Sequence, residues 1–423
     1  MPDRTRAPKI QAIQQLTLPV PKQFQLDNGI PVYTIDMGTQ DVLKVEFVFR
    51  AGRPFEDKEL VSRATAELLK EGTTQKTAAQ IAETIDFYGG SLSAPVNLDT
   101  SNVVLYCLNR HFEKLLPLLA ELLTSPAFPQ KELDSFIRNS QQRLQLDLSK
   151  NDVVAYREIT EMIFGSEHPY GYNSNANTYG AIERDDLIRH FEKNFTAKNC
   201  RIFVSGRIHA NTIGLLNDYL GSVLPIGEAN QVKLPKTEHQ PAHKKISRPE
   251  AVQTAIRIGR RLFNRGHADY PGMYVLNTVL GGYFGSRLMA NIREEKGYTY
   301  NIFSTMDIMH HDGYFYIGTE VGNDFTETTI NEIYREMAVL AEKEIDAAEL
   351  EMVRSYLAGH LLTMLDGPFN IADLVKMYVN RGIPFKAFDE LVHVIKTIEP
   401  SRLRQLAEKY FQKDDHWEVV VGV

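Results

Sequence analysis

The sequence predicts an α+β fold made of two homologous units of about 210 residues each. This prediction depends on two stretches, IERDDLIRHFEKNFTAKNCRIFVSG (182–206) and IEPSRLRQLAEKYFQKDDHWEVVVG (398–422), which lie 216 positions apart. Each has a helical apolar period followed by an apolar run typical of a strand. Identical residues recur at this offset: Ile182/Ile398, Glu183/Glu399, Leu187/Leu403, Glu192/Glu408, Lys193/Lys409, Phe195/Phe411, Val204/Val420 and Gly206/Gly422.

We expect each unit to hold a mixed, mostly antiparallel sheet with helices packed on one face. Two such units joined by a linker can close like a clamshell over a cleft, where ligand sites tend to lie. The predicted domains are residues 1–226 and 250–423. The segment 227–249 is polar, contains prolines and has no apolar period, so we interpret it as the linker.

The first unit begins, after an arm or linker over residues 1–20, with a hairpin around Asp27-Asn28-Gly29. A capping box from Thr77 to Gln80 marks the start of one helix. The predicted strands that follow the hairpin are 42–52, 91–99, 101–109 and 200–206. The predicted helices are 60–70, the capped helix, 112–124, 130–163, 185–195 and 210–223.

The second unit begins with AVQTAIRIGRR, whose alternation favours a strand. A second capping box, Asp346 to Glu349, marks the start of a long helix. Strands are predicted at 298–307, 313–321 and 417–423. Helices are predicted at 269–280, 325–343, 346–365, 370–381, 386–395 and 401–411.

Composition and charge narrow the class of protein. The 423 residues are 43% apolar and 24% charged, which is ordinary for a globular chain with two cores. A net charge of −7 gives no indication of nucleic acid or an anionic membrane as partner. Cys107 and Cys200 lie in or beside apolar strand-like runs, and we expect buried free thiols.

No run of about 18 apolar residues occurs, so we expect no transmembrane helix. The start, MPDRTRAPKIQAIQQL, has basic residues but no apolar core of a secretory signal. We therefore expect a cytoplasmic protein, with the periplasm as the alternative if a signal has been removed.

The stretch LGGYFGSRLMANIREEKGYTY, residues 280–300, is the most distinctive part of the second unit. Gly281, Gly282 and Gly285 allow close backbone approach, which we expect to admit substrate. The segment SRLMANIREEKG has the apolar period of a short amphipathic helix that ends at Gly297.

Arg293 and Tyr300 lie on opposite sides of the predicted helix-to-strand turn. A guanidinium and a phenol brought together there can both donate hydrogen bonds to a carbonyl oxygen or a developing oxyanion. Spacing alone favours a plainer interpretation, a surface arginine and a half-buried tyrosine.

The pattern GGxxxSRL followed by IREEKGYTY resembles the signature of the pitrilysin/insulinase family of zinc peptidases, which includes the mitochondrial processing peptidases. The resemblance extends over essentially the whole chain and also implies the clamshell. In that family an Arg/Tyr pair is thought to hold substrate opposite the zinc. This pair corresponds here to Arg293 and Tyr300.

Zinc-binding members of the family carry an inverted His-x-x-Glu-His motif on a helix of the first half. Alignment on Gly72-Thr73 puts Arg63 at the first His, Ala66 at the general base and Glu67 at the second His. The third ligand, a Glu in the family, falls near Arg143. Arginine has no lone pair to give, alanine cannot move a proton, and one carboxylate cannot build a tetrahedral zinc site. We expect Arg63 and Glu67 to form an ion pair on one helix face.

The remaining histidines show no ligand spacing on a recognisable helix face. His239 and His243 are four apart but Pro241 separates them, and the adjacent pair His310-His311 points to opposite sides of any strand. We therefore expect no catalytic residue and no metal on this chain, with zinc on a partner subunit.

The resemblance implies one half of a two-part active site. The leading hypothesis is a non-catalytic, Arg/Tyr-bearing subunit of a heteromeric zinc metallopeptidase that binds extended peptide, inactive on its own. Its partner would be a homologous zinc-motif subunit in a heterodimer, and a homodimer is the alternative assembly. The alternative function is a structural or peptide-binding scaffold with no proteolytic role.

Overall fold

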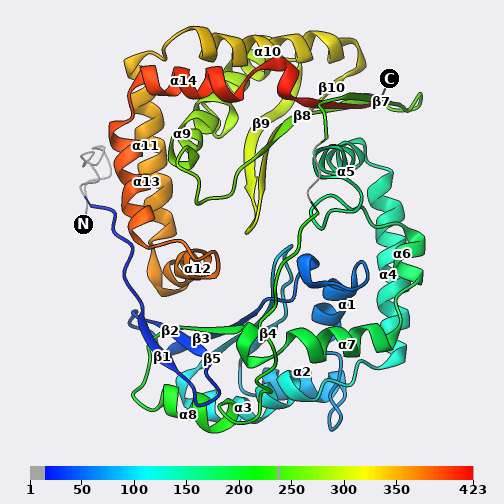
Figure 1. Cartoon of the computed structure of the whole chain (residues 1–423), viewed down its shortest axis with the longest axis vertical. Coiled ribbons are helices and arrows are strands. Elements are labelled where there is room, and N and C mark those ends of the chain that lie inside the picture. The colour runs from blue at the N-terminus through cyan, green and yellow to red at the C-terminus, as the bar shows by residue number, and fades with distance from the viewer. Residues whose placement is uncertain (1–14, 236–238, 423) are drawn as a thin grey trace, which may run out of the picture.

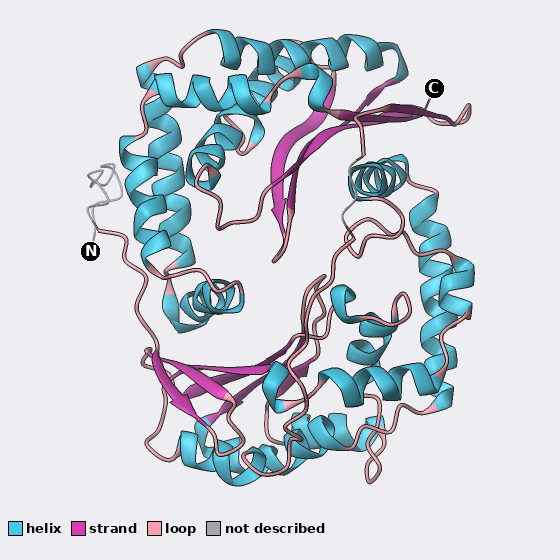
Figure 2. Cartoon of the chain, viewed as in Figure 1, coloured by secondary structure: helices cyan, strands magenta, loops and turns pink. Residues whose placement is uncertain are grey.

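The computed structural model describes residues 15–235 and 239–422, which form two halves of similar design (Figures 1 and 2). The predicted arm over residues 1–20 lies mostly outside the described residues. The first half contains strands β1 (Lys22–Gln25), β2 (Pro31–Asp36), β3 (Val42–Phe49), β4 (Ser91–Ser93), β5 (Ser101–Leu108) and β6 (Cys200–Gly206). Its helices are α1 (Val61–Leu68), α2 (Ala78–Phe87), α3 (Asn109–Thr124), α4 (Gln130–Leu148), α5 (Asn151–Phe164), α6 (Ala176–Gly180), α7 (Arg184–Asn194) and α8 (Thr212–Leu220).

The second half contains strands β7 (His243–Ser247), β8 (Gln253–Leu262), β9 (Thr299–Ile308), β10 (Gly313–Gly322) and β11 (Trp417–Gly422). Its helices are α9 (Tyr270–Gly281), α10 (Thr326–Glu342), α11 (Ala347–Met364), α12 (Gly367–Asn380), α13 (Lys386–Thr397) and α14 (Pro400–Tyr410), with the π-helix η3 (Met289–Glu295) after α9.

The two sheets share one topology. The first has the order β1-β2-β6-β3-β5-β4 and the second the order β7-β11-β8-β10-β9. In each, one pair is parallel, β2 with β6 and β7 with β11, and the other pairs are antiparallel. Helix α14 begins and ends 216 positions after α7. The predicted pair of mixed, mostly antiparallel α+β units is confirmed.

The halves exchange one helix each. Helix α5 of the first half packs on β8 and β11 of the second sheet, and α12 of the second half packs on β2 and β6 of the first sheet (Figure 1). Apolar side chains continue across both contacts: Val48 and Phe203 join the core of the second half, and Ile159 of α5 joins Val419 of β11. Each sheet therefore has its own helices on one face and a borrowed helix on the other.

A buried ion network accompanies the contact of α12 with the first sheet. Glu46 of β3 accepts hydrogen bonds from Lys376 of α12 at 2.8 and 2.9 Å and lies 3.1 Å from Lys44, while Lys44 donates to Asp373 of α12 at 2.8 Å. Asn102 also donates to Glu46, at 2.7 Å. The Lys44 and Glu46 side chains are only 5% and 3% exposed. Because burial costs each charge its hydration, removal of one partner leaves the others uncompensated.

Several local predictions differ from the structure. The single helix expected over 130–163 is two helices, α4 and α5, separated at Ser149-Lys150. The capping box at Thr77 is confirmed. The second box does not form: the Asp346 side chain accepts from the amide of Ala348 at 2.8 Å, but the Glu349 side chain is bonded to Arg287 instead. Strand β7 forms inside the segment expected to be a bare linker; the domain limits at 226 and 250 stay a prediction.

Two smaller predictions concern the cysteines and the membrane. Cys107 and Cys200 are buried free thiols, as predicted. Within the described ranges 15–235 and 239–422, no helix has the length and apolar content needed to cross a bilayer.

We predict that Glu46→Gln lowers the free energy of unfolding by on the order of 3 kcal/mol, because Lys44 and Lys376 lose their shared counter-charge in a buried contact. Chemical denaturation measures this change. Glu408→Gln, which removes a helix-surface partner of Arg404, is the matched control and should cost less than about 0.5 kcal/mol. Equal losses in both variants would contradict the role given to the network.

Two buried histidines predict a loss of stability in acid. Burial lowers the pKa of both His190 and His416 to about 4. The Nδ1 atom of His190 accepts a hydrogen bond from Asn194 at 3.0 Å, and a proton on Nδ1 would break this bond. The Nε2 atom of His416 is buried with no hydrogen-bond partner among the described residues, so a proton there would have no acceptor. Between pH 6.5 and about 4 these two histidines bind protons in the unfolded chain but stay neutral in the folded chain. The free energy of unfolding therefore falls as the pH falls through this range.

Each of these histidines should contribute about 2 kcal/mol to the difference in unfolding free energy between pH 7 and pH 5. His190→Gln should reduce that difference by about this amount, measured by denaturant titration at the two pH values. His360→Gln, at an exposed ring, is the control and should leave the difference unchanged.

Candidate functional site

The glycine-rich stretch joins α9 to the π-helix. Gly281 is buried, and a Cβ atom there would lie 2.5 Å from the backbone nitrogen of Ser304, so this glycine lets the end of α9 approach β9. A Cβ at Gly282 would press on Thr278, and Gly285 is exposed beside Tyr283. The close contacts of Gly281 and Gly282 are thus with the chain itself; a substrate role for the three glycines stays a prediction.

The predicted amphipathic helix is a π-helix, η3, rather than an α-helix. Its wide turn ends with the amide of Lys296 bonded to the carbonyl of Asn291, five residues back, at 3.1 Å. Ile292 is fully buried, as the apolar period predicts, and Gly297 has a φ of +67°, which turns the chain into β9. Such π turns are uncommon and often occur at functional sites.

Ion pairs fix the π-helix and the preceding loop on neighbouring helices. Arg287 donates two hydrogen bonds to Glu349 of α11, both at 2.9 Å. Lys296 lies 3.4 Å from Glu332 of α10, and Asn291 donates to that carboxylate at 3.1 Å. The backbone that carries Arg293 is therefore attached at both ends.

Arg293 and Tyr300 do meet, as predicted. The Arg293 guanidinium lies 5.1 Å from the ring centroid of Tyr300 and 4.6 Å from that of Phe284. Tyr300 is 86% exposed and Phe284 is 61% exposed. In the described part of the chain, no carboxylate pairs with Arg293 and no group hydrogen-bonds to the Tyr300 hydroxyl, in contrast to the paired Arg287 and Lys296.

The Arg293 guanidinium and the Tyr300 hydroxyl are both available as hydrogen-bond donors to a ligand. The guanidinium is held between two rings, which limits its orientations by cation–π contact. Its N–H groups and the phenolic O–H can donate to one oxygen of a bound ligand. The half-buried tyrosine of the plainer interpretation is not observed, because Tyr300 is almost fully exposed.

The positions of the zinc motif lie on α1 and form a small polar cluster. Arg63 donates from Nε to Glu67 at 2.6 Å and from Nη1 to the Tyr179 hydroxyl at 3.0 Å. Ala66 is buried. Burial lowers the pKa of Arg63, but the hydrogen bond and charge of Glu67 outweigh burial and raise it above its ordinary value. The predicted ion pair of Arg63 and Glu67 is confirmed.

These residues do not fit a zinc ion. The Arg63 guanidinium puts a fixed positive charge at the position of the first ligand, and its Nε donates to Glu67, the one carboxylate of the motif that remains. Arg143, near the expected third ligand, is 79% exposed and lies 3.9 Å from Asp147. Among residues 15–235 and 239–422, no group of three or more His, Cys, Asp or Glu side chains is placed to hold a metal.

Sequence reasoning missed two contacts of these sites. Phe284 flanks Arg293, and Tyr179 closes the Arg63 cluster from α6, 116 positions along the chain. Phe284 could have been singled out in the sequence, because it is an aromatic residue directly before Gly285. No local pattern marks Tyr179, because its approach depends on how α6 packs against the rest of the first half.

Comparison with known proteins gives one family for both halves. Residues 33–165 match the model of insulinase (peptidase family M16), and residues 181–357 match the model of the peptidase M16 inactive domain. An uncharacterized zinc protease YmxG of Bacillus subtilis is 23% identical over 93% of this chain and 96% of its own length. A non-peptidase homolog YmxG of Helicobacter pylori is 25% identical over 88% of this chain and 87% of its own length.

Solved structures show the same fold. A peptidase M16 inactive domain from Pseudomonas fluorescens superposes with a TM-score of 0.88 at 21% identity, over 95% of this chain and 98% of that one. A protease from Helicobacter pylori superposes with a TM-score of 0.86 at 17% identity, over 96% of this chain and all of that one. The clamshell of two M16-type units is thereby supported.

We predict that a chelator leaves the melting temperature of this protein unchanged, because Arg63 and Ala66 cannot ligate zinc. Thermal unfolding with and without EDTA measures this. In Arg63→His/Glu67→His, two imidazoles at i and i+4 should make the melting temperature rise on addition of zinc. A fall of several degrees in the unmodified protein on chelation would contradict the interpretation of α1.

Proposed function

This chain belongs to peptidase family M16, and from that premise we propose that it is a non-catalytic, Arg/Tyr-bearing subunit of a heteromeric zinc metallopeptidase. The observation that carries the proposal is the guanidinium of Arg293, held between Phe284 and Tyr300 without a carboxylate partner among the described residues. The positions on α1 that would hold zinc do not fit the metal, so the chain is inactive on its own.

The proposed task of the pair is to hold the scissile carbonyl. An N–H of Arg293 and the O–H of Tyr300 donate to the carbonyl oxygen, and these bonds strengthen as negative charge develops on it. Neither group needs to be freed from an internal partner first. The zinc and the attacking water belong to the partner subunit.

Strand β9 offers the substrate a backbone to pair with. It is at the edge of its sheet, bonded to β10 on one side only, and Tyr300 is its second residue. An extended peptide added to this edge gains main-chain hydrogen bonds that do not depend on sequence. Loose sequence preference and a requirement for unfolded substrate follow.

The proposed partner is a homologous chain that carries an intact His-x-x-Glu-His motif. In this proposal the partner supplies the zinc site opposite Arg293, because the corresponding positions on α1 of the present chain do not fit the metal. A homodimer is the alternative assembly, and light scattering without a partner distinguishes the two.

The test is reconstitution with a zinc-motif relative. We expect no peptide hydrolysis by the purified chain alone and zinc-dependent hydrolysis by the pair. Arg293→Ala should lower kcat/KM of the pair by about 100-fold, and Tyr300→Phe by about 10-fold, because each removes a donor to the oxyanion. Arg335→Ala, at an exposed arginine of α10 near Glu332, is the control and should change kcat/KM less than about twofold.

A second function is favoured by one comparison, the relative described as a non-peptidase homolog. In that case the chain is a peptide-binding or scaffold subunit with no proteolytic role. The pair would then form and bind unfolded peptide without hydrolysis, and Arg293→Ala would alter peptide affinity alone. Chelator-sensitive hydrolysis by the isolated chain would contradict both functions.

A further inference from the structure

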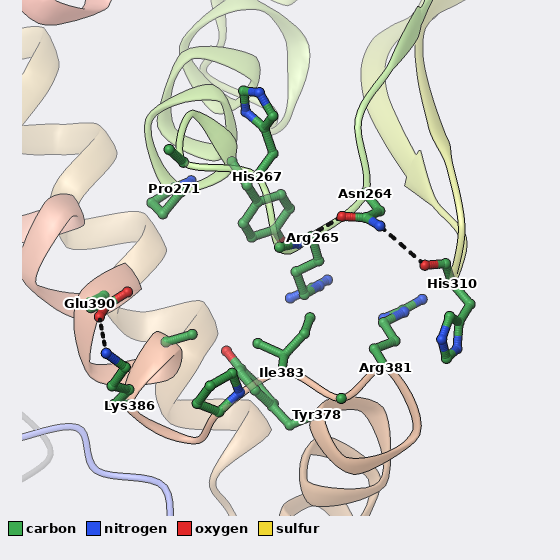
Figure 3. Close-up of a pocket in the computed structure, with 16 residues that line it drawn as sticks. Asn264, Arg265, His267, Pro271, His310, Tyr378, Arg381, Ile383, Lys386 and Glu390 are labelled. Carbon is green, nitrogen blue, oxygen red and sulfur yellow. Dashed lines mark hydrogen bonds and ion pairs between the residues drawn. The ribbon is translucent and has the colours of Figure 1, made fainter.

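A cavity of about 450 Å³ lies at the opposite end of β9 from Tyr300 (Figure 3). Its walls come from the loop between β8 and α9, the turn between β9 and β10, and the end of α12 with the loop that leads to α13. None of Arg293, Tyr300 or the zinc-motif positions lines it. The volume is within the usual range for small-molecule sites.

Two arginines direct their charge into this cavity. Figure 3 shows the guanidinium of Arg265 in the middle of the cavity and that of Arg381 beside it. The Nε atom of Arg265 is buried with no hydrogen-bond partner, and its guanidinium lies 4.7 Å from the ring centroid of Tyr270. Arg381 donates to the carbonyl of Ile308 at 2.6 Å. Neither arginine has an ion pair with a carboxylate of the described residues.

Several basic groups lie in and around the cavity. Burial, and then the charge of Arg265, lowers the pKa of Arg381. Burial and the neighbouring ring of His311 lower the pKa of His310 to about 4. A smaller cavity of about 140 Å³, which also has His310 in its wall, is lined by Arg50 and Arg201.

Two carboxylates close to the cavity already have hydrogen-bond or ion-pair partners. Asp99 accepts hydrogen bonds from the Tyr170 hydroxyl and, at 2.9 Å, from the backbone amide of His310. Glu390, at the far rim, lies 3.8 Å from Lys386. Arg265 shares a hydrogen bond with the Tyr378 hydroxyl and Arg381 donates to Ile308, but no carboxylate of the described residues pairs with either guanidinium. An anion that enters between the two arginines therefore meets positive charge that has no ion-pair partner there.

The remaining wall is apolar and aromatic, with Tyr270, Pro271, Tyr378, Ile383 and Pro384 around the arginines. A fully hydrated inorganic ion would leave this surface without a partner. We propose that the cavity binds a carboxylate carried on an apolar group, with Arg265 and Arg381 as the donors to the carboxylate. Such a ligand is either a free apolar carboxylic acid or the C-terminal residue of a peptide.

Isothermal titration calorimetry of the whole chain tests the proposal with four probes: N-acetyl-L-leucine, N-acetyl-L-leucinamide, the peptide Ala-Ala-Leu with a free carboxylate, and inorganic phosphate. We expect the first to bind and its amide, which lacks the charge, to bind at least about tenfold more weakly. Tighter binding of the peptide than of N-acetyl-L-leucine assigns a peptide C-terminus as the ligand. Equal or weaker binding of the peptide assigns a free acid.

Variants locate the site. Arg265→Gln should weaken binding of N-acetyl-L-leucine at least about tenfold. Lys386→Gln removes the same charge from the same cavity but from a residue already beside Glu390, so it is the matched control and should change affinity less than about twofold. Without ligand, Arg265→Gln should melt at or above the temperature of the unmodified protein, because it removes one of two neighbouring positive charges.

Three results would overturn the proposal: equal binding of acid and amide, binding of phosphate but not of N-acetyl-L-leucine, or a loss of binding in Arg50→Gln that Arg265→Gln does not share. The last would place the anion in the smaller cavity. The comparison of acid with amide uses the unmodified chain, so the test stands even if a variant fails to fold.

Discussion

The exchange of α5 and α12 is the contact on which the rest of this structure depends. A sheet with two apolar faces needs cover on both, and each half has helices of its own on only one face. The second face is covered by a helix of the other half, with buried side chains such as Val48 and Ile159 continuing the core across the contact. Each half therefore covers a sheet face of the other, and the buried network around Glu46 joins α12 to β3 across one of these contacts.

The presence or absence of a carboxylate partner distinguishes the structural arginines from the candidate functional ones. Arg63 and Arg287 are each bonded to a carboxylate of the same chain, and their donors are used. Arg293 and Arg265 lie against aromatic rings instead and have no carboxylate partner among the described residues. The residues on α1 do not fit zinc, whereas the guanidinium at the π-helix has no carboxylate partner in the part of the chain that the structure describes.

Much of this was accessible from the sequence. The repeat at offset 216 predicted the two units. Spacing alone favoured a surface arginine and a half-buried tyrosine, and the pairing of Arg293 with Tyr300 was predicted from the family resemblance. Strand β7 was missed because its residues are polar and exposed, although its place beside β11 mirrors that of β2 beside β6. The break between α4 and α5 was missed because Ser149-Lys150 is a weak stop signal. Arg265 and Arg381 come together only through tertiary packing, and no local sequence pattern predicts that contact.

The winding of the π-helix determines in which direction the side chain of Arg293 points. A π turn holds one residue more than an α turn, so its side chains follow a different angular progression around the axis. If the seven residues Met289–Glu295 wound as an α-helix of the same length, the guanidinium would point roughly 100° away from its present direction, the angle per residue of an α-helix. The alignment of arginine and phenol thus depends on the winding of this segment as much as on the identity of either side chain.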